Sequence, residues 1–186
     1  NTLLFLIGGF LVMWMAAGFA MLETGLVRSK NASTQLLKNV ALFSLASIAY
    51  FIVGFNLMYP GDGWIINGWM GGFSLTGLEP AGVDADGVDL TYASVGSDFF
   101  FQLMFCAATA SIVSGTVAER VKLWPFLIFT VVLTGIFYPI SASWQWGGGW
   151  LSEAGFSDFA GSTVVHATGA AAALAGAMVI GARHGR

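Results

Sequence analysis

The sequence has very few charged residues. Aspartate, glutamate, lysine and arginine together make up 9% of the 186 residues, whereas hydrophobic residues make up 56%. A water-soluble domain carries about 25% charged residues, and so small a number of charges cannot cover a surface that faces water. We therefore expect the lipid bilayer to be the solvent for most of this chain. The net charge of −3 does not indicate a nucleic-acid partner.

Cysteine is almost absent as well. The single cysteine, Cys106, lies in an apolar run, so it cannot form an intrachain disulfide and lacks the neighbours of a metal site. We interpret it as a small buried hydrophobic residue. The acidic segment DADGVD (84–89) lacks the full pattern of a calcium-binding loop. No nucleophile–base pair or cluster of metal ligands occurs in or near the apolar runs, so the sequence predicts neither an enzyme nor a bound cofactor.

Long apolar runs dominate what is present. A helix needs about 20 residues to cross a bilayer, and five runs reach that length. We predict an all-α integral membrane protein with five transmembrane helices, at residues 2–22, 39–59, 99–118, 123–142 and 160–182. The connection 60–98 is rich in glycine and aspartate and is expected at the outer surface. The tryptophans at this boundary are interpreted as an interfacial aromatic belt: Trp64, Trp69, Trp144 and Trp150.

The basic residues predict the direction in which the chain crosses the membrane. All seven follow the first, third or fifth run: Arg28, Lys30, Lys38, Arg120, Lys122, Arg183 and Arg186. Lysine and arginine are enriched on the cytoplasmic side, so we expect the N-terminus outside and the C-terminus inside. Glu23 lies near the inner end of the first run, close to two of these basic residues, and is expected to act locally at that interface.

The fifth run is built of small residues and contains one histidine. Glycine and alanine permit close approach of neighbouring helices, so we expect this helix at the centre of the bundle. His166 shares a helical face with four small residues and faces either tight packing or a slender channel: Gly169, Ala170, Ala173 and Ala177. An imidazole at membrane depth needs partners. The residues alone leave open a structural hydrogen bond, a haem ligand or a role in conduction.

Three further features allow more than one interpretation. Phe101 and Phe105 are four residues apart and share a helical face, as packing residues or as a gate. Trp146 stands in the segment WQWGGGW at the outer end of the fourth run, where it is either an interfacial anchor or a cation site that uses the indole face. Asp158 precedes the fifth helix, where it either accepts hydrogen bonds from the first N–H groups of the helix or attracts a cation from outside.

Three segments resemble signature segments of the ammonium transporter family (Amt/Mep/Rh): GFAMLETGLVRSKN, FQLMFCAATASIVSGTVAER and DFAGSTVVHATGAAAALAGAMVIG. The resemblance runs along the whole chain and is weakest in the connection 60–98. It implies a fold of eleven helices, in which the first ten form two inverted five-helix repeats, usually assembled as a homotrimer with a pore in each subunit. Residues 1–186 are then interpreted as the N-terminal repeat of a longer polypeptide, an ammonium transporter-like membrane domain without its second repeat.

The resemblance also implies an external site for the ammonium ion. Trp146 matches the tryptophan that holds the cation, Phe105 lies beside it, and Ala160 matches a position whose carbonyl faces the site. Asp158 matches the aspartate that supports the backbone of this site without touching the ion.

Phe101 and Phe105 match the phenylalanine gate of the family, and His166 matches the first of two paired pore histidines. The implied function is transport of ammonium or ammonia across the plasma or inner membrane, with methylammonium as a further candidate substrate. The cation is recruited outside and deprotonated, and ammonia passes along the histidine-lined pore. A cytoplasmic regulatory protein is an expected partner besides the lipid bilayer. The alternative is an ammonium-sensing membrane domain of a signalling protein.

Overall fold

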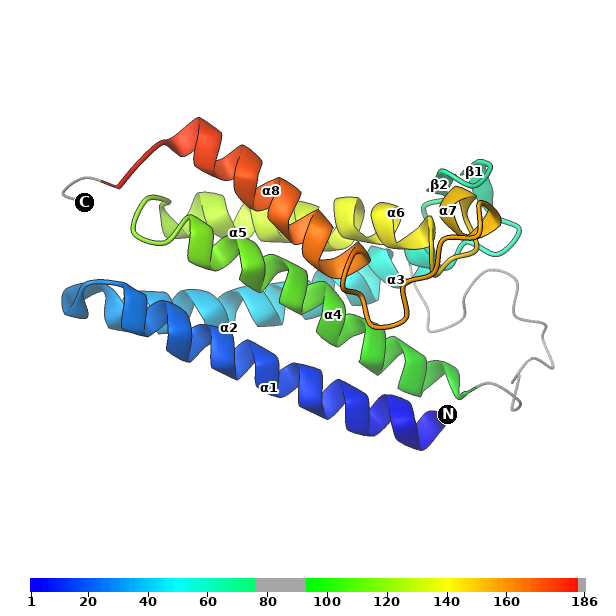
Figure 1. Ribbon diagram of the computed structural model, residues 1–186, viewed down its shortest axis with the longest axis horizontal. Coiled ribbons are helices and arrows are strands. Elements are labelled where there is room, and N and C mark those ends of the chain that lie inside the picture. Colours follow the sequence, from blue (N-terminus) through cyan, green and yellow to red (C-terminus); the bar gives the residue numbers. More distant parts are fainter. Residues whose placement is uncertain (76–92, 184–186) are drawn as a thin grey trace.

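The computed structural model describes residues 1–75 and 93–183, and most of this backbone is helical (Figure 1). The helices are α1 (Thr2–Leu26), α2 (Ala32–Ala49), α3 (Phe55–Met58), α4 (Val95–Thr116), α5 (Leu123–Val132), α6 (Tyr138–Ser143), α7 (Trp150–Glu153) and α8 (Val164–Ile180). A short antiparallel hairpin joins β1 (Trp64–Ile66) and β2 (Met70–Gly71), so the described chain is not wholly helical. The acidic segment 84–89 lies outside the described residues.

Two pairs of helices are each continuous through a π-helical turn. The turn Tyr50–Gly54 joins α2 to α3, and the turn Leu133–Phe137 joins α5 to α6. Four helices in the described part are long and apolar enough to cross a membrane: Thr2–Leu26, Ser29–Met58, Val95–Thr116 and Leu123–Ser143. The first four predicted spans are therefore confirmed as helices of membrane length.

The fifth predicted span starts later than expected. Helix α8 has 17 residues and begins at Val164 instead of 160, because the preceding residues form a tight turn. At a rise of 1.5 Å per residue it is about 25 Å long. That it crosses the membrane as a fifth span stays a prediction.

Helix α4, and not α8, lies at the centre of the described bundle. Of its most apolar stretch 67% is buried, compared with 11% for α1. Figure 1 shows α8 on one side of α4 and α1 on the other. Within the described residues the small side chains of α8 pack closely on one side only, and its central place in the bundle stays a prediction. A side chain at Gly169 would come within 3.0 Å of Ile112 on α4, whereas Ala170 is exposed.

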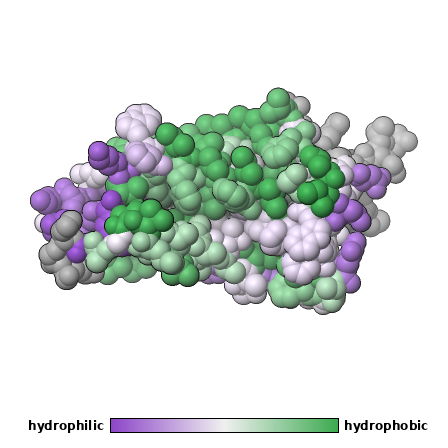
Figure 2. All heavy atoms as spheres, turned by 90° about the horizontal axis from the view of Figure 1, so that it is seen from above, coloured by the Kyte–Doolittle hydropathy of each residue, from purple (hydrophilic) through white to green (hydrophobic). Residues whose placement is uncertain are grey.

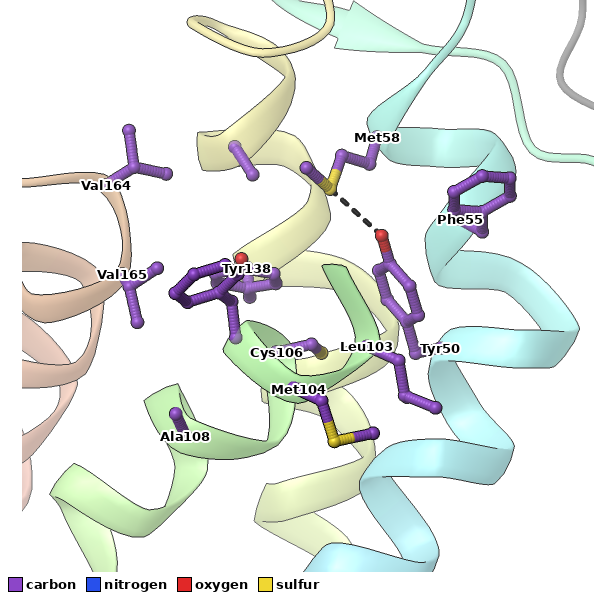
Figure 3. Packing of buried hydrophobic residues seen from close by; sticks show 12 residues of the cluster. Tyr50, Phe55, Met58, Leu103, Met104, Cys106, Ala108, Tyr138, Val164 and Val165 are labelled. Carbon is purple, nitrogen blue, oxygen red and sulfur yellow. Dashed lines mark hydrogen bonds between the residues drawn. The ribbon is translucent and has the colours of Figure 1, made fainter. Parts of the chain in front are cut away.

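The main core lies where α4 meets the two interrupted helices (Figure 3). Cys106 is fully buried there and donates to the carbonyl oxygen of Thr134 (3.4 Å), which confirms its interpretation as a buried residue. Tyr50 donates to the sulfur of Met58 (3.1 Å), and Tyr138 packs between them and α8. This core includes residues of α6, the helix that leads to Trp146, and so holds that helix in place.

The basic segments gather at one end of the bundle. Arg28 and Arg183, from opposite ends of the chain, both contact Glu119, at 3.2 and 3.5 Å. In Figure 2 hydrophobic residues cover the middle of the molecule and hydrophilic residues lie toward its two ends. The grouping of these arginines is as expected, and the orientation across the membrane stays a prediction.

Glu23 and Lys38 differ from what we expected. Lys38 lies inside α2, only 4% exposed, and donates to the carbonyl oxygen of Ser114 (2.9 Å). Glu23 is 2% exposed and accepts hydrogen bonds from Gln35, Asn39 and the Ser114 hydroxyl, instead of contacting the neighbouring basic residues. The expectation of a local interfacial role is wrong, because α2 turns two amide side chains toward the end of α1. The cluster joins α1, α2 and α4.

Candidate functional site

The loop between α6 and α7 carries Trp146 and is unusually tight. A side chain at Gly147 would collide with the Met58 carbonyl oxygen, and one at Gly149 would come within 2.7 Å of the Gly68 carbonyl oxygen. Gly148 has φ +77°, which disfavours any residue with a Cβ. The three glycines of WQWGGGW thus allow the chain to fold back and present the indole of Trp146.

The aromatic side chains form a continuous row. Phe5 of α1 stacks on Phe101, with ring centroids 4.9 Å apart and planes at 8°. Phe101 meets Phe105 edge to face at 4.8 Å, and Phe105 lies 5.9 Å from Trp146. Edge-to-face and offset contacts at these distances are attractive. The structure therefore brings both predicted phenylalanines and the predicted tryptophan into one row, with Phe105 between the other two.

The orientation of the indole is fixed on two sides. Trp146 Nε1 donates to the backbone carbonyl oxygen of Asp158 (2.8 Å). Gly161, with φ +76°, lies so close that a Cβ there would be 3.1 Å from the Trp146 ring. Because the N–H is already engaged and one edge is covered, the face of the ring is what the residue offers to a ligand.

The Asp158 side chain binds the start of α8. It is 8% exposed, and its two oxygens accept hydrogen bonds of 2.7–3.1 Å from four consecutive backbone N–H groups, those of Gly161, Ser162, Thr163 and Val164. A carboxylate is favourable there because the first N–H groups of a helix lack intrahelical acceptors and point toward it. The predicted contact with the helix start is confirmed. In this arrangement both oxygens of the Asp158 carboxylate face the backbone N–H groups.

His166 lies in the first turn of α8, close to the same turn. Its ring Nδ1 is 3.3 Å from the Gly161 carbonyl oxygen. A proton on Nδ1 donates to this oxygen and leaves Nε2 as an acceptor. The predicted small-residue face is divided: Gly169 and Ala173 are buried, whereas His166 and Ala170 are exposed in the described chain. Ala160 is also exposed, one residue before Gly161.

Thr109 is a residue of this region that we did not predict. It is fully buried, and its hydroxyl lies 3.1 Å from the Phe105 carbonyl oxygen and 3.4 Å from that of Val165. It thereby links the helix that carries the phenylalanines to the helix that carries His166. A single threonine in an apolar helix gives no sign of this role in the sequence. Among residues 1–75 and 93–183, no group of three histidine, cysteine or acidic side chains is placed to hold a metal ion.

These features define the class of protein. The chain is an α-helical membrane protein whose candidate site lies where α4, the α6–α7 loop and the turn before α8 meet. It belongs to the ammonium transporter family: the model of the "Ammonium Transporter Family" matches residues 3–186.

Individual relatives agree with this assignment. The chain is 44% identical to the ammonium transporter Amt2 of Archaeoglobus fulgidus over 191 residues, which cover 97% of this chain and 38% of the relative. It is 39% identical to Amt2 of Haloferax mediterranei, with 95% of this chain and 38% of the relative covered. The crystal structure of Saccharomyces cerevisiae Mep2 matches with a TM-score of 0.81 and 26% identity, over 98% of this chain and 40% of that chain. The chain therefore spans about two fifths of the length of these relatives.

Proposed function

We propose that this chain is part of a protein that transports ammonium across the cell membrane. The family assignment supports this proposal, as do the names of the relatives, which are called ammonium transporters. The sensing alternative has no support from these relatives. We further propose five spans with the N-terminus outside, a homotrimeric assembly and contact with a cytoplasmic regulatory protein. The single observation that carries the substrate proposal is the fixed indole of Trp146 beside Phe105.

The outer step is recruitment of the cation. The face of an indole attracts a cation through its quadrupole by about 0.5–2 kcal/mol. Trp146 supplies that face, and Phe105 bounds the space beside it on one side. The backbone carbonyl group of Ala160, in the turn before α8, is the proposed polar group of the site. The Asp158 carboxylate is engaged with four N–H groups, which supports a role in holding the turn and not in contacting the ion.

The inner step is passage of the neutral species. An ammonium ion loses far more hydration energy than ammonia when it leaves water, so an apolar lumen favours the deprotonated form. Phe101 and Phe105 are the proposed gate that excludes water from this lumen. His166 is the proposed group that holds ammonia and takes part in proton relay, with a second histidine supplied from outside this sequence. The exposure of His166 on α8 supports a position facing a lumen or another part of the protein.

Replacing the indole tests the recruitment step. In protein expressed from the complete reading frame and reconstituted in liposomes, Trp146→Leu should raise the half-saturating ammonium concentration about tenfold, because a desolvated cation–π contact is lost. The matched control is Trp124→Leu, which removes a 74% exposed tryptophan at the start of α5. Equal half-saturating concentrations for the two variants would refute the proposed recruitment site.

A further inference from the structure

The hairpin β1–β2 packs on the loop that carries Trp146. The backbone N–H of Trp150 donates to the Gly68 carbonyl oxygen (3.0 Å), and Trp144 Nε1 donates to the Trp69 carbonyl oxygen (2.8 Å). Figure 1 shows the hairpin beside α7 at one end of the molecule. Trp144 and Trp150 flank Trp146 in the sequence, so the hairpin holds the loop on both sides of the proposed cation site.

The side chain of Trp69 strengthens this contact. Its ring stacks on Trp150, with centroids 4.7 Å apart and planes at 11°, and meets Trp144 edge to face at 5.9 Å. A stack at this spacing has no room for a ligand between the rings, so these tryptophans do not form a cation cage. Trp69 is 49% exposed, and Trp144 and Trp150 contact its ring. The three residues pack on one another, which is more than the separate interfacial anchors that we expected.

The loop has little freedom to adjust if this contact is lost. At its start the Trp146 N–H donates to the Ala142 carbonyl oxygen (2.8 Å), and at its end the Gly149 N–H donates to that of Ser143 (3.0 Å). Gly147 lies directly against the Met58 carbonyl oxygen, and Gly149 against the Gly68 carbonyl oxygen in the hairpin turn. The hairpin holds the loop at Trp144 and Trp150, on either side of Trp146, so a shift of the hairpin would act on the Trp146 backbone through these two residues.

We propose that Trp69 is a positioning residue: from the outer hairpin it holds the loop backbone that carries Trp146, in addition to the Asp158 and Gly161 contacts that orient the indole, and it does not touch the transported ion. This inference rests on the proposed recruitment role of Trp146. It predicts that the loss of the Trp69 ring weakens recruitment and leaves the later steps of transport unchanged. It also predicts that Trp69 has no influence once the Trp146 indole is absent.

The experiment compares five variants in protein from the complete reading frame, reconstituted in liposomes: Trp69→Leu, Trp69→Phe, Trp146→Leu, the double variant Trp69→Leu/Trp146→Leu, and Ile65→Ala. Trp69→Leu keeps apolar volume but not the flat stack, and Trp69→Phe keeps a stacking ring. Ile65 is a matched control, because it lies in β1 and is 59% exposed. Ammonium uptake is measured against concentration, and the amount of folded protein is quantified for each variant.

The inference predicts that Trp69→Leu raises the half-saturating concentration about fivefold at unchanged maximal uptake, the size expected for an aromatic contact. Trp69→Phe and Ile65→Ala should stay within about twofold of the parent protein. The double variant should match Trp146→Leu alone, because residues that act through one another are not additive.

Three results would overturn it. If Trp69→Leu matches the parent while Trp146→Leu is impaired, the positioning role is wrong and the recruitment site stands. If Trp69→Leu only lowers the amount of folded protein or the maximal uptake, or adds its full effect in the double variant, its role is general stability. If Trp146→Leu itself has no effect, the recruitment site fails, and the inference fails with it.

Discussion

A single carboxylate holds the turn from which α8 starts. Asp158 accepts four backbone hydrogen bonds, and its own carbonyl oxygen accepts from the Trp146 indole. The same residue therefore fixes the first turn of the helix that carries His166 and the ring that is proposed to bind the cation. Its charge is turned to the helix N-terminus, where a negative charge is stabilising.

The consequence of this geometry is a graded response to substitution. Asp158→Ala leaves four N–H groups without their acceptor and should destabilise the protein by about 3 kcal/mol. Asp158→Asn keeps one acceptor oxygen and should cost about half as much. Thermal unfolding in detergent gives the stabilities, and uptake assays the activities. If the asparagine variant were as stable as the parent but as inactive as the alanine variant, the carboxylate would serve the ion directly and our assignment would be wrong.

His166 and Thr109 show how neighbouring residues on two helices are brought into register. Thr109 contacts the carbonyl oxygen of Val165, directly before the histidine, and that of Phe105 on its own helix. The two contacts link the position of His166 along α8 to that of Phe105 on α4. The spacing of residues within each helix could be read from the sequence. The register between α4 and α8 involves the buried Thr109 hydroxyl, which the sequence did not single out.

At the level of elements, a buried polar cluster joins α1, α2 and α4. Ser114 connects its two charged members, since its hydroxyl donates to Glu23 (2.7 Å) and its carbonyl oxygen accepts from Lys38 (2.9 Å). Glu23 and Lys38 both contact Ser114 and are not paired directly, so compensation between these two buried charges acts across Ser114.

We therefore expect Glu23 and Lys38 to be coupled. Glu23→Gln and Lys38→Met should each destabilise the protein by about 3 kcal/mol. The double variant should lose at least about 1 kcal/mol less than the sum of the two. Thermal unfolding of the four proteins in detergent completes the cycle. Additive losses would show that the two charges do not compensate one another.

A second polar cluster joins the segments that follow α1, α4 and α8, at the end of the molecule away from Trp146. Glu119 has a left-handed backbone, with φ +61°, and its carboxylate accepts from the Arg28 N–H (2.9 Å) and the Asn31 side chain (2.7 Å) and pairs with Arg183. The Arg28 N–H, the Asn31 amide and the Arg28 charge lower the pKa of Glu119 from 4.5 to about 2. A non-glycine residue in this conformation is held there by its surroundings.

This shift predicts a pH dependence. Because the pKa is lower in the folded protein, the stabilising contribution of Glu119 is fully present above pH 4.5 and is lost as the pH falls toward 2. The thermal stability of the parent protein should exceed that of Glu119→Gln at pH 6, and the difference should shrink below about pH 4.5. Unfolding curves of both proteins at several pH values measure it. A difference that stays constant or widens on acidification would contradict this account.

At the scale of the whole molecule, apolar runs predicted the four long helices well, because a membrane span is defined by length and hydrophobicity. The same criterion failed at Lys38, which was counted as a flanking residue although it is buried in α2. It also placed the start of α8 too early, since residues 160–163 (AGST) are small like those of the helix and give no sign of the turn. Small residues indicate close packing but not on how many sides, so the central place expected for α8 stays a prediction.

The candidate site was predictable only in part. The resemblance singled out Phe101, Phe105, Trp146 and Asp158, and the structure brings them together. The roles of gate, recruitment site and support remain proposals. The hairpin and its tryptophans could not be placed from sequence, because their contacts join segments about 75 residues apart whose composition is typical of any outer loop.

The central claim is that His166 takes part in passage of ammonium or ammonia, and its removal tests this most directly. Uptake and selectivity over potassium are measured in liposomes for the protein from the complete reading frame, for His166→Ala, and for Met178→Ala, a 77% exposed control on α8. We predict that His166→Ala lowers ammonium uptake at least about tenfold or abolishes its selectivity, as expected for a group that transfers protons, while the control is unaffected. Unchanged uptake and unchanged selectivity in His166→Ala would contradict the account.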